Sequence, residues 1–171
     1  MTSYHESGLI ITLPDKEHFS FQDCHGYKTL SGQNLKEMDF GWWRDDTLWL
    51  IEIKEYANLT SNEQLPAHLL DNFVNKATDS LLMLASLWAE TNHGLKLAPC
   101  LPPQIHKFPK RLKLFFILKI DKVIFKSQII HLKDALKNRL RGRLILFDVK
   151  HVSLVDHLTA IKCNLPIAIE D

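Results

Sequence analysis

The chain has 171 residues, of which 46% are hydrophobic and 24% charged, and its formal net charge at pH 7 is +1. These values are ordinary for a globular protein, and the length predicts one domain spanning residues 1–171. No apolar stretch is long enough to cross a bilayer, and the N-terminus has no basic segment followed by an apolar core. We therefore expect a cytoplasmic protein with no membrane contact.

The three cysteines are Cys24, Cys100 and Cys163, which are odd in number and far apart in the sequence. They form no CxxC pair, so the sequence indicates neither a disulfide framework nor a zinc ribbon. The prediction is that these thiols are reduced and buried.

The first elements in chain order are β-strands. Leu9–Leu13 is rich in β-forming residues, and the alternation over Phe19–Cys24 predicts a second strand. Two apolar and aromatic runs, 36–43 and 47–56, then flank the polar tetrad 44–47. Such a pattern is typical of a β-hairpin with a tight turn.

The register of this hairpin brings acidic residues together. If the turn centres on Asp45 and Asp46, cross-strand partners have numbers that sum to 91, and Asp39 lies opposite Glu52. Side chains alternate along a strand, so Glu52 and Lys54 project from one face. The sequence therefore predicts two carboxylates and an ammonium in one small volume.

These groups suit a divalent cation. Like charges directly opposite one another destabilise a hairpin, and a bound cation removes that repulsion. Asp39, Glu52 and the backbone carbonyl of Ile53 offer the oxygen ligands that Mg²⁺ or Mn²⁺ prefers. Lys54 would orient a water molecule or stabilise charge on a phosphate. The alternative is an ordinary cross-strand ion pair on the protein surface.

The remaining elements alternate between helices and strands. They are a helix over 66–92, a strand over 112–120, a helix over 129–140 that ends at Gly142, a strand over 144–149, and a last helix that follows the capping pair Ser153 and Asp156. A strand–helix–strand unit joined to an antiparallel hairpin predicts an α/β fold. We expect a mixed central β-sheet with helices on both faces.

Basic residues gather in the second part of the chain. Residues 1–100 contain 7 Lys and Arg against 14 Asp and Glu, whereas residues 101–171 contain 14 against 6. Such asymmetry favours a polyanionic partner, here nucleic acid. One basic cluster is Lys107, Lys110, Arg111 and Lys113, and the candidate nucleic-acid-binding residues are Lys76, Lys133, Lys137, Arg139, Arg141 and Arg143. The alternative for all of them is a solvated helix face.

The pattern resembles the PD-(D/E)xK nuclease superfamily over residues 35–120. Asp39 matches the first acid of that family, Glu52 the second acid and Lys54 the lysine, while Met38 takes the place of the motif's proline. The resemblance implies a restriction-endonuclease-like core and a catalytic set of Asp39, Glu52 and Lys54. It also implies a Mg²⁺- or Mn²⁺-dependent endonuclease that hydrolyses phosphodiester bonds in DNA, alone or as a subunit of a DNA-processing assembly.

Many members of that superfamily carry a further acid ahead of the hairpin, and the candidates for it are Glu6, Glu17 and Glu37. A chain of this size has little room for a separate recognition domain, so a homodimer or a protein partner would supply specificity. The alternative function is a non-catalytic nucleic-acid-binding or interaction domain that keeps the nuclease fold.

Overall fold

The structure is a computed structural model that describes residues 1–30, 32–56, 68–120 and 126–170. It is an α/β fold built on a five-stranded mixed sheet with the order β3-β4-β5-β6-β7. The strands are β3 (His18–Phe19), β4 (Phe40–Arg44), β5 (Thr47–Glu55), β6 (Arg111–Lys119) and β7 (His151–Asp156). Pairing is antiparallel from β3 to β5 and parallel from β5 to β7. The predicted mixed central sheet is confirmed.

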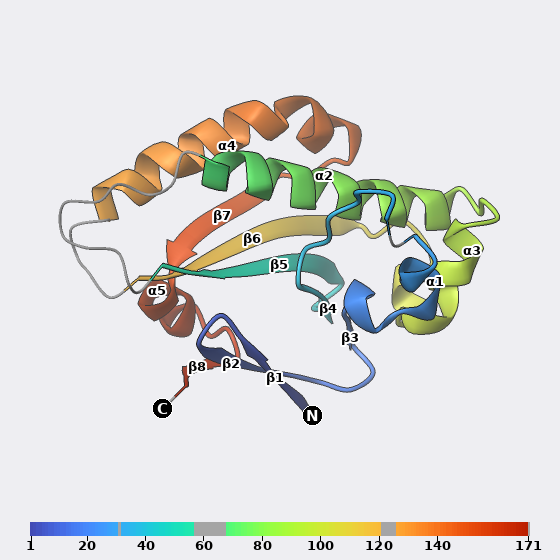
Figure 1. The fold of residues 1–171 in the computed structure, drawn as a ribbon, viewed down its shortest axis with the longest axis horizontal. Coiled ribbons are helices and arrows are strands. Elements are labelled where there is room, and N and C mark those ends of the chain that lie inside the picture. Colours follow the sequence, from blue (N-terminus) through green and yellow to red (C-terminus); the bar gives the residue numbers. More distant parts are fainter. Residues whose placement is uncertain (31, 57–67, 121–125, 171) are drawn as a thin grey trace.

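Two long helices cover one face of this sheet. They are α2 (His68–Trp88), which follows β5, and α4 (Lys126–Leu146), which follows β6 (Figure 1). Apolar side chains of β5 and β6, including Leu50 and Phe116, are buried against this layer, and Phe73 of α2 packs on the Phe116 ring at 4.9 Å. The predicted start of the first helix near residue 66 lies outside the described residues.

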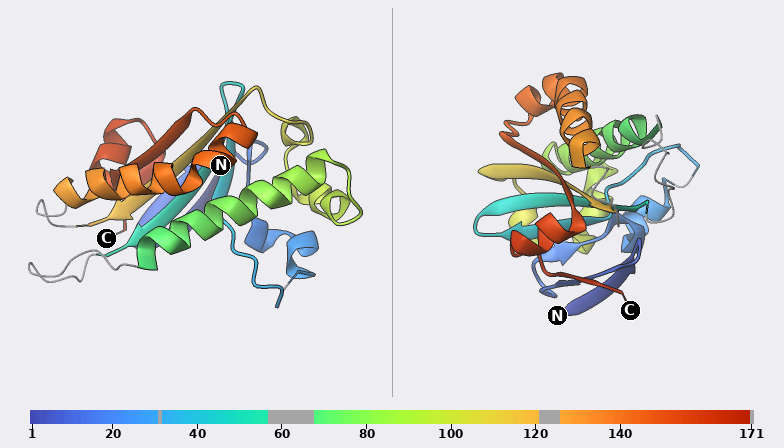
Figure 2. Two further views of the ribbon diagram at one scale, coloured as in Figure 1. Left: turned by 90° about the horizontal axis from the view of Figure 1, so that it is seen from above. Right: turned by 90° about the vertical axis from the view of Figure 1, so that its left-hand side faces the viewer.

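A second, smaller sheet and a short helix cover the opposite face (Figures 1 and 2). The sheet has the order β1-β2-β8 and consists of β1 (Thr2–Glu6), β2 (Leu9–Leu13) and β8 (Ile167–Ile169), and the helix is α5 (His157–Lys162). Ile51 and Ile53 of β5 belong to the core on this side. Successive residues of β5 therefore serve two cores, which leaves Glu52 on the side of α2.

The hairpin register is as predicted. Phe40 pairs with Ile51 and Arg44 with Thr47, so partner numbers sum to 91. Asp45 and Asp46 have φ values of +49° and +54°, which is the left-handed pair that a two-residue type I′ turn requires. Asp and Asn tolerate this conformation better than other non-glycine residues. The turn chemistry thus fixes which residues of β4 and β5 face one another.

Three predicted elements were wrong. Phe19–Cys24 is not a strand, because β3 ends at Phe19 and a 3₁₀ turn, η1 (Phe21–Asp23), follows. The helix α4 does not stop at Gly142 but runs to Leu146, so 144–149 is not a strand. A side chain at Gly142 would meet open space, and an exposed helical glycine costs only about 1 kcal/mol.

The real last strand of the large sheet is β7, where burial alternates along His151–Asp156. Ser153 therefore lies inside a strand and caps nothing. Asp156 alone caps α5, since its Oδ1 accepts a hydrogen bond from the Thr159 amide at 2.8 Å. Over the described residues, no helix is both long and apolar enough to cross a membrane.

The short elements at one end of the molecule carry a disulfide that the sequence did not predict. These elements are α1 (His25–Lys28), α3 (Gly94–Leu97), η2 (Ala98–Cys100) and η3 (Pro103–Ile105). Cys24, the residue before α1, bonds to Cys100 across 76 positions of sequence, and Cys163 is a free, exposed thiol. The prediction of reduced thiols was wrong for Cys24 and Cys100, and the prediction of burial was wrong for Cys163. The spacing of cysteines gives no information on pairs brought together by the fold.

We expect the change Cys100→Ser to lower the free energy of unfolding by about 2–4 kcal/mol, because the bridge closes a long loop. Urea denaturation without reductant measures the difference. Cys163→Ser is the matched control, since the same atom is lost from a thiol that forms no bridge. Equal midpoints for Cys100→Ser and wild type under oxidising conditions would contradict the prediction.

Candidate active site

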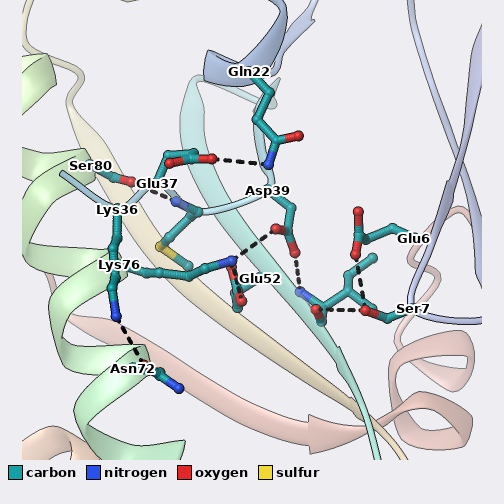
Figure 3. Close-up of polar contacts among 12 residues, drawn as sticks. Glu6, Ser7, Gln22, Lys36, Glu37, Asp39, Glu52, Asn72, Lys76 and Ser80 are labelled. Carbon is teal, nitrogen blue, oxygen red and sulfur yellow. Dashed lines mark hydrogen bonds and ion pairs between the residues drawn. The ribbon is translucent and has the colours of Figure 1, made fainter. Parts of the chain in front are cut away.

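Three charged side chains from three elements meet beside β5. Asp39 is the residue before β4, Glu52 lies in β5, and Lys76 lies on α2. The Lys76 Nζ donates to Asp39 Oδ1 at 3.1 Å and lies 2.7 and 2.9 Å from the two oxygens of Glu52 (Figure 3). Only 6% of Asp39 and 1% of Glu52 is exposed. The structure therefore brings the two predicted, buried acids together around the half-buried ammonium of Lys76.

Backbone hydrogen bonds hold Asp39 in place. Its Oδ2 accepts from the Ile53 amide at 2.7 Å, so the side chain continues the ladder one residue before β4 begins. The preceding amide, that of Met38, donates to the buried hydroxyl of Ser80 at 2.8 Å (Figure 3). Ser80 lies one helical turn after Lys76 on α2, so both face the segment 38–39. The acid is thereby fixed to a strand and to a helix at once.

Lys54 is close to this cluster without joining it. It lies two residues after Glu52 and shares its side of β5, yet it is exposed. It forms no ion pair or hydrogen bond with the other described residues. Burial dominates the pKa of Glu52 and raises it, and the charge of Lys54 opposes this effect. The amine that contacts both acids is thus Lys76, which the sequence analysis placed only among the nucleic-acid-binding candidates.

Burial and charge perturb all three groups. Burial raises the pKa of Asp39 despite the opposing effect of Lys76. Burial and then the charge of Asp39 raise the pKa of Glu52 well above its usual value. Burial acts to lower the pKa of Lys76, but Glu52 and Asp39 outweigh it and the pKa is raised. When all three are ionised, the cluster holds two negative charges against one positive charge.

Glu6, the last residue of β1, lies on the other side of Asp39 (Figure 3). Its negative charge raises the pKa of Asp39, and its Oε1 accepts from the Ser7 hydroxyl at 3.0 Å. The same hydroxyl donates to the Ile53 carbonyl at 3.3 Å (Figure 3). Glu6 and Asp39 line a common hollow of about 190 Å³, together with Tyr4 and Asp23 among others. This hollow is where Asp39 approaches solvent.

The other candidates for a third acid face different neighbours. Glu37 accepts hydrogen bonds from Gln22, at 2.9 Å, and from Tyr27. Glu17 is exposed, and its side chain forms no polar contact with the described residues. Of the three acids that the sequence suggested, Glu6 is the one that acts electrostatically on Asp39.

The oxygen atoms here fit a hard divalent cation. Among the described residues, no three His, Cys, Asp or Glu side chains group closely enough to hold a metal. Mg²⁺, however, is often bound through only one or two carboxylates, with water and substrate phosphates as further ligands. Asp39, Glu52 and the Ile53 carbonyl are the oxygen ligands that such a site would use. The excess negative charge of the cluster also favours binding of a cation.

The basic residues predicted on the second long helix are found on α4. Arg139 pairs with Asp71 of α2 at 2.8 Å, and Arg143 donates to the Arg139 carbonyl at 3.1 Å. Lys133, Lys137 and Arg141 also lie on α4. Within the described part of the chain, none of the five forms a hydrogen bond or ion pair with Asp39, Glu52 or Lys76.

Comparison with known proteins assigns no family. A scan against protein-family models, a search of curated proteins and a search of solved structures each found no match. The role of the cluster is therefore inferred from its own geometry and charge. Two of its members, Asp39 and Glu52, are the acids that the sequence pattern singled out, and the third comes from the helix that packs over them.

Proposed function

We propose that the protein is a metal-dependent nuclease that hydrolyses phosphodiester bonds in nucleic acid, in particular DNA, with Asp39 and Glu52 as its metal ligands. The observation that carries this proposal is the pair of buried carboxylates that share a single ammonium. A buried charge without compensation is costly, and proteins keep such groups chiefly where function needs them. The resemblance to the PD-(D/E)xK superfamily rests on the same two acids and on Lys54.

This proposal gives each residue of the site a role. Asp39, Glu52 and the Ile53 carbonyl would hold Mg²⁺ or Mn²⁺, which supplies a Lewis acid for the phosphate and lowers the pKa of a bound water. Lys76 places a positive charge at the same oxygens and stabilises negative charge that develops on a phosphate beside them. Lys54, exposed on the same side of β5, is left to orient the attacking water from the solvent side.

One observation favours a second candidate function, a non-catalytic nucleic-acid-binding or interaction domain. Lys76 satisfies both carboxylates at once, so the cluster also works as an ion pair that ties α2 to β5. In that case Asp39 and Glu52 would contribute to stability and to nothing else. Metal dependence separates the two candidates, because only the nuclease requires a divalent cation.

The decisive experiment is cleavage of a plasmid with Mg²⁺ or Mn²⁺. We expect Asp39→Asn to reduce the rate at least about 100-fold, because even the groups that support a metal ligand carry 10- to 100-fold effects. Asp45→Asn is the matched control: it makes the same change in the hairpin turn, where the side chain is 88% exposed. Unchanged cleavage by Asp39→Asn, or no cleavage by wild type with either metal, would remove the nuclease proposal.

The change Lys54→Ala distinguishes the role of Lys54 from that of Lys76. We expect this change to lower kcat about 10- to 100-fold with little change in thermal stability, since the side chain is exposed and unpaired among the described residues. Lys16→Ala, another exposed lysine, is the control for the loss of one charge. Steady-state cleavage of an oligonucleotide and a thermal melt supply both measurements. A normal kcat in Lys54→Ala would assign the amine's role to Lys76 alone.

A further inference from the structure

A basic hollow lies at the opposite end of the large sheet from the strand ends that follow Glu52. It has a volume of about 370 Å³ and is lined by Lys110, Arg111, Leu112, Asp148, Lys150 and His151. These residues come from two chain segments that meet where the parallel strands β6 and β7 begin. Residues far apart in the sequence thus gather cationic groups in one depression.

The positive charge of this hollow is uncompensated. Lys110, Arg111 and Lys150 are exposed, and none of them has an ion-pair partner in the part of the chain that the structure describes. Asp148 is the single acid in the lining, and it pairs with none of them. Three cations against one carboxylate leave an excess positive charge. Such an excess attracts an anion.

The pairing of the strands places a further cation, Lys113, beside the hollow. Arg111 and Lys113 share a face of β6, and Lys113 lies directly opposite His151 of β7 and Trp49 of β5. The Lys113 ammonium lies 4.3 Å from the centre of the Trp49 ring. On the next strand, the Arg44 guanidinium lies 5.0 Å from the Trp42 ring. A row therefore leads from the hollow to the hairpin, with two neighbouring rings, Trp49 and Trp42, between the cations Lys113 and Arg44.

We propose that this hollow, with the row that leads from it, binds the phosphate backbone of a nucleic acid. Arginine forms bidentate hydrogen bonds with phosphate, and lysine supplies a mobile point charge. A single free phosphate would occupy only the hollow, whereas the row crosses three strands and needs an extended polyanion. The partly exposed ring of Trp49 beside Lys113 also suits nucleic acid better than an acidic protein, since bases stack on aromatic side chains.

The hollow is a binding site apart from the acidic cluster. Arg111 pairs with Thr47, which precedes Glu52 by five residues on β5, so the two sites are about 17 Å apart along the strands. That length corresponds to about five base pairs of duplex. The phosphate groups bound in the hollow would therefore lie well away from the phosphodiester bond beside Asp39 and Glu52. The inference does not require cleavage, because binding is measurable without any metal.

The test is fluorescence anisotropy with a labelled oligonucleotide in EDTA at several salt concentrations. For the double change Lys110→Ala and Lys150→Ala, we expect affinity to fall about tenfold or more and the slope of log K against log salt to fall by about 2. The control is Lys16→Ala with Lys96→Ala, which removes equal charge from other exposed positions. Equal losses in both double variants, or an unchanged slope, would overturn the proposal.

A change of opposite sign sharpens this test. Asp148→Asn removes the acid of the hollow at a position with φ +50°, which Asn tolerates, and we expect a several-fold rise in affinity. Inorganic phosphate and poly-glutamate serve as competitors. Competition by either at the concentration at which unlabelled oligonucleotide competes would overturn nucleic acid as the ligand. Oligonucleotide binding that depends on the hollow, in a protein that cleaves nothing, would support this site while removing the nuclease proposal.

Discussion

Lys76→Met is expected to lower the free energy of unfolding by about 3–5 kcal/mol at pH 7, as for other buried ion pairs that lose one partner. The change leaves Asp39 and Glu52 facing each other in the core with no positive charge in contact. Methionine keeps most of the volume of the lysine stem, so the loss is electrostatic rather than a cavity effect. Lys36→Met is the matched control, because the ammonium of that exposed lysine has Asn72 as its one polar partner among the described residues.

This loss depends on pH in a defined direction. Burial already raises the pKa of Asp39 and of Glu52 in the folded protein, and removal of Lys76 raises both further. An acid whose pKa is higher in the folded state destabilises the fold only where it is charged. The cost is absent below the ordinary pKa values near 4 and grows as the pH rises towards the folded-state values.

The stability difference between Lys76→Met and wild type should therefore shrink as the pH falls from 7 towards 4. Urea denaturation at several pH values measures it, with Lys36→Met alongside. A deficit that stays constant over this range would show that the lysine acts through packing. A deficit below about 0.5 kcal/mol at pH 7 would mean that the two acids are not charged together in the core.

Glu52→Gln should separate stability from activity. We expect the nuclease rate to fall at least about 100-fold, because a metal ligand is lost. We also expect the free energy of unfolding at pH 7 to rise by about 1 kcal/mol or more, because the change removes the uncompensated charge. The amide oxygen still accepts a hydrogen bond from Lys76. The gain should vanish towards pH 4, where the glutamate of the wild type is itself neutral.

The control is Glu17→Gln, which makes the same change at an exposed glutamate without polar contacts among the described residues. It should alter neither rate nor stability. Plasmid cleavage and thermal melts at pH 7 give both quantities for each variant. A Glu52→Gln protein that is less stable than wild type would show that the cluster is a purely structural ion pair, which favours the non-catalytic candidate function.

The sequence predicted correctly those features that depend on residues close together in the chain. The hairpin register followed from the turn at Asp45 and Asp46 and from strand alternation, and these two features place Asp39 opposite Glu52. The position of Lys76 depends on how α2 crosses β5, for which helical periodicity gives a face but not a neighbour. Nothing in the sequence pattern distinguished an inward Lys76 from one that faces solvent.

The errors have physical causes as well. The run 144–149 is apolar enough for a buried strand, yet Ile145 and Leu146 end a helix with 69% and 80% of their surfaces exposed. An isolated apolar run cannot be assigned by periodicity, and an exposed glycine does not stop a helix that packing supports. The bond between Cys24 and Cys100 depends on tertiary contacts that local patterns do not encode.

The two anchors on α2 tie any activity to completion of the fold. Ser80 and Lys76 are one turn apart and hold the adjacent residues Met38 and Asp39. A helix that docked one turn out of place, a shift of about 5.4 Å, would release both. The turn sequence favours the hairpin locally, but Asp39 and Glu52 contact Lys76 only once α2 has packed on the sheet. For the nuclease proposed above, a chain in which α2 has not docked would thus lack an assembled site.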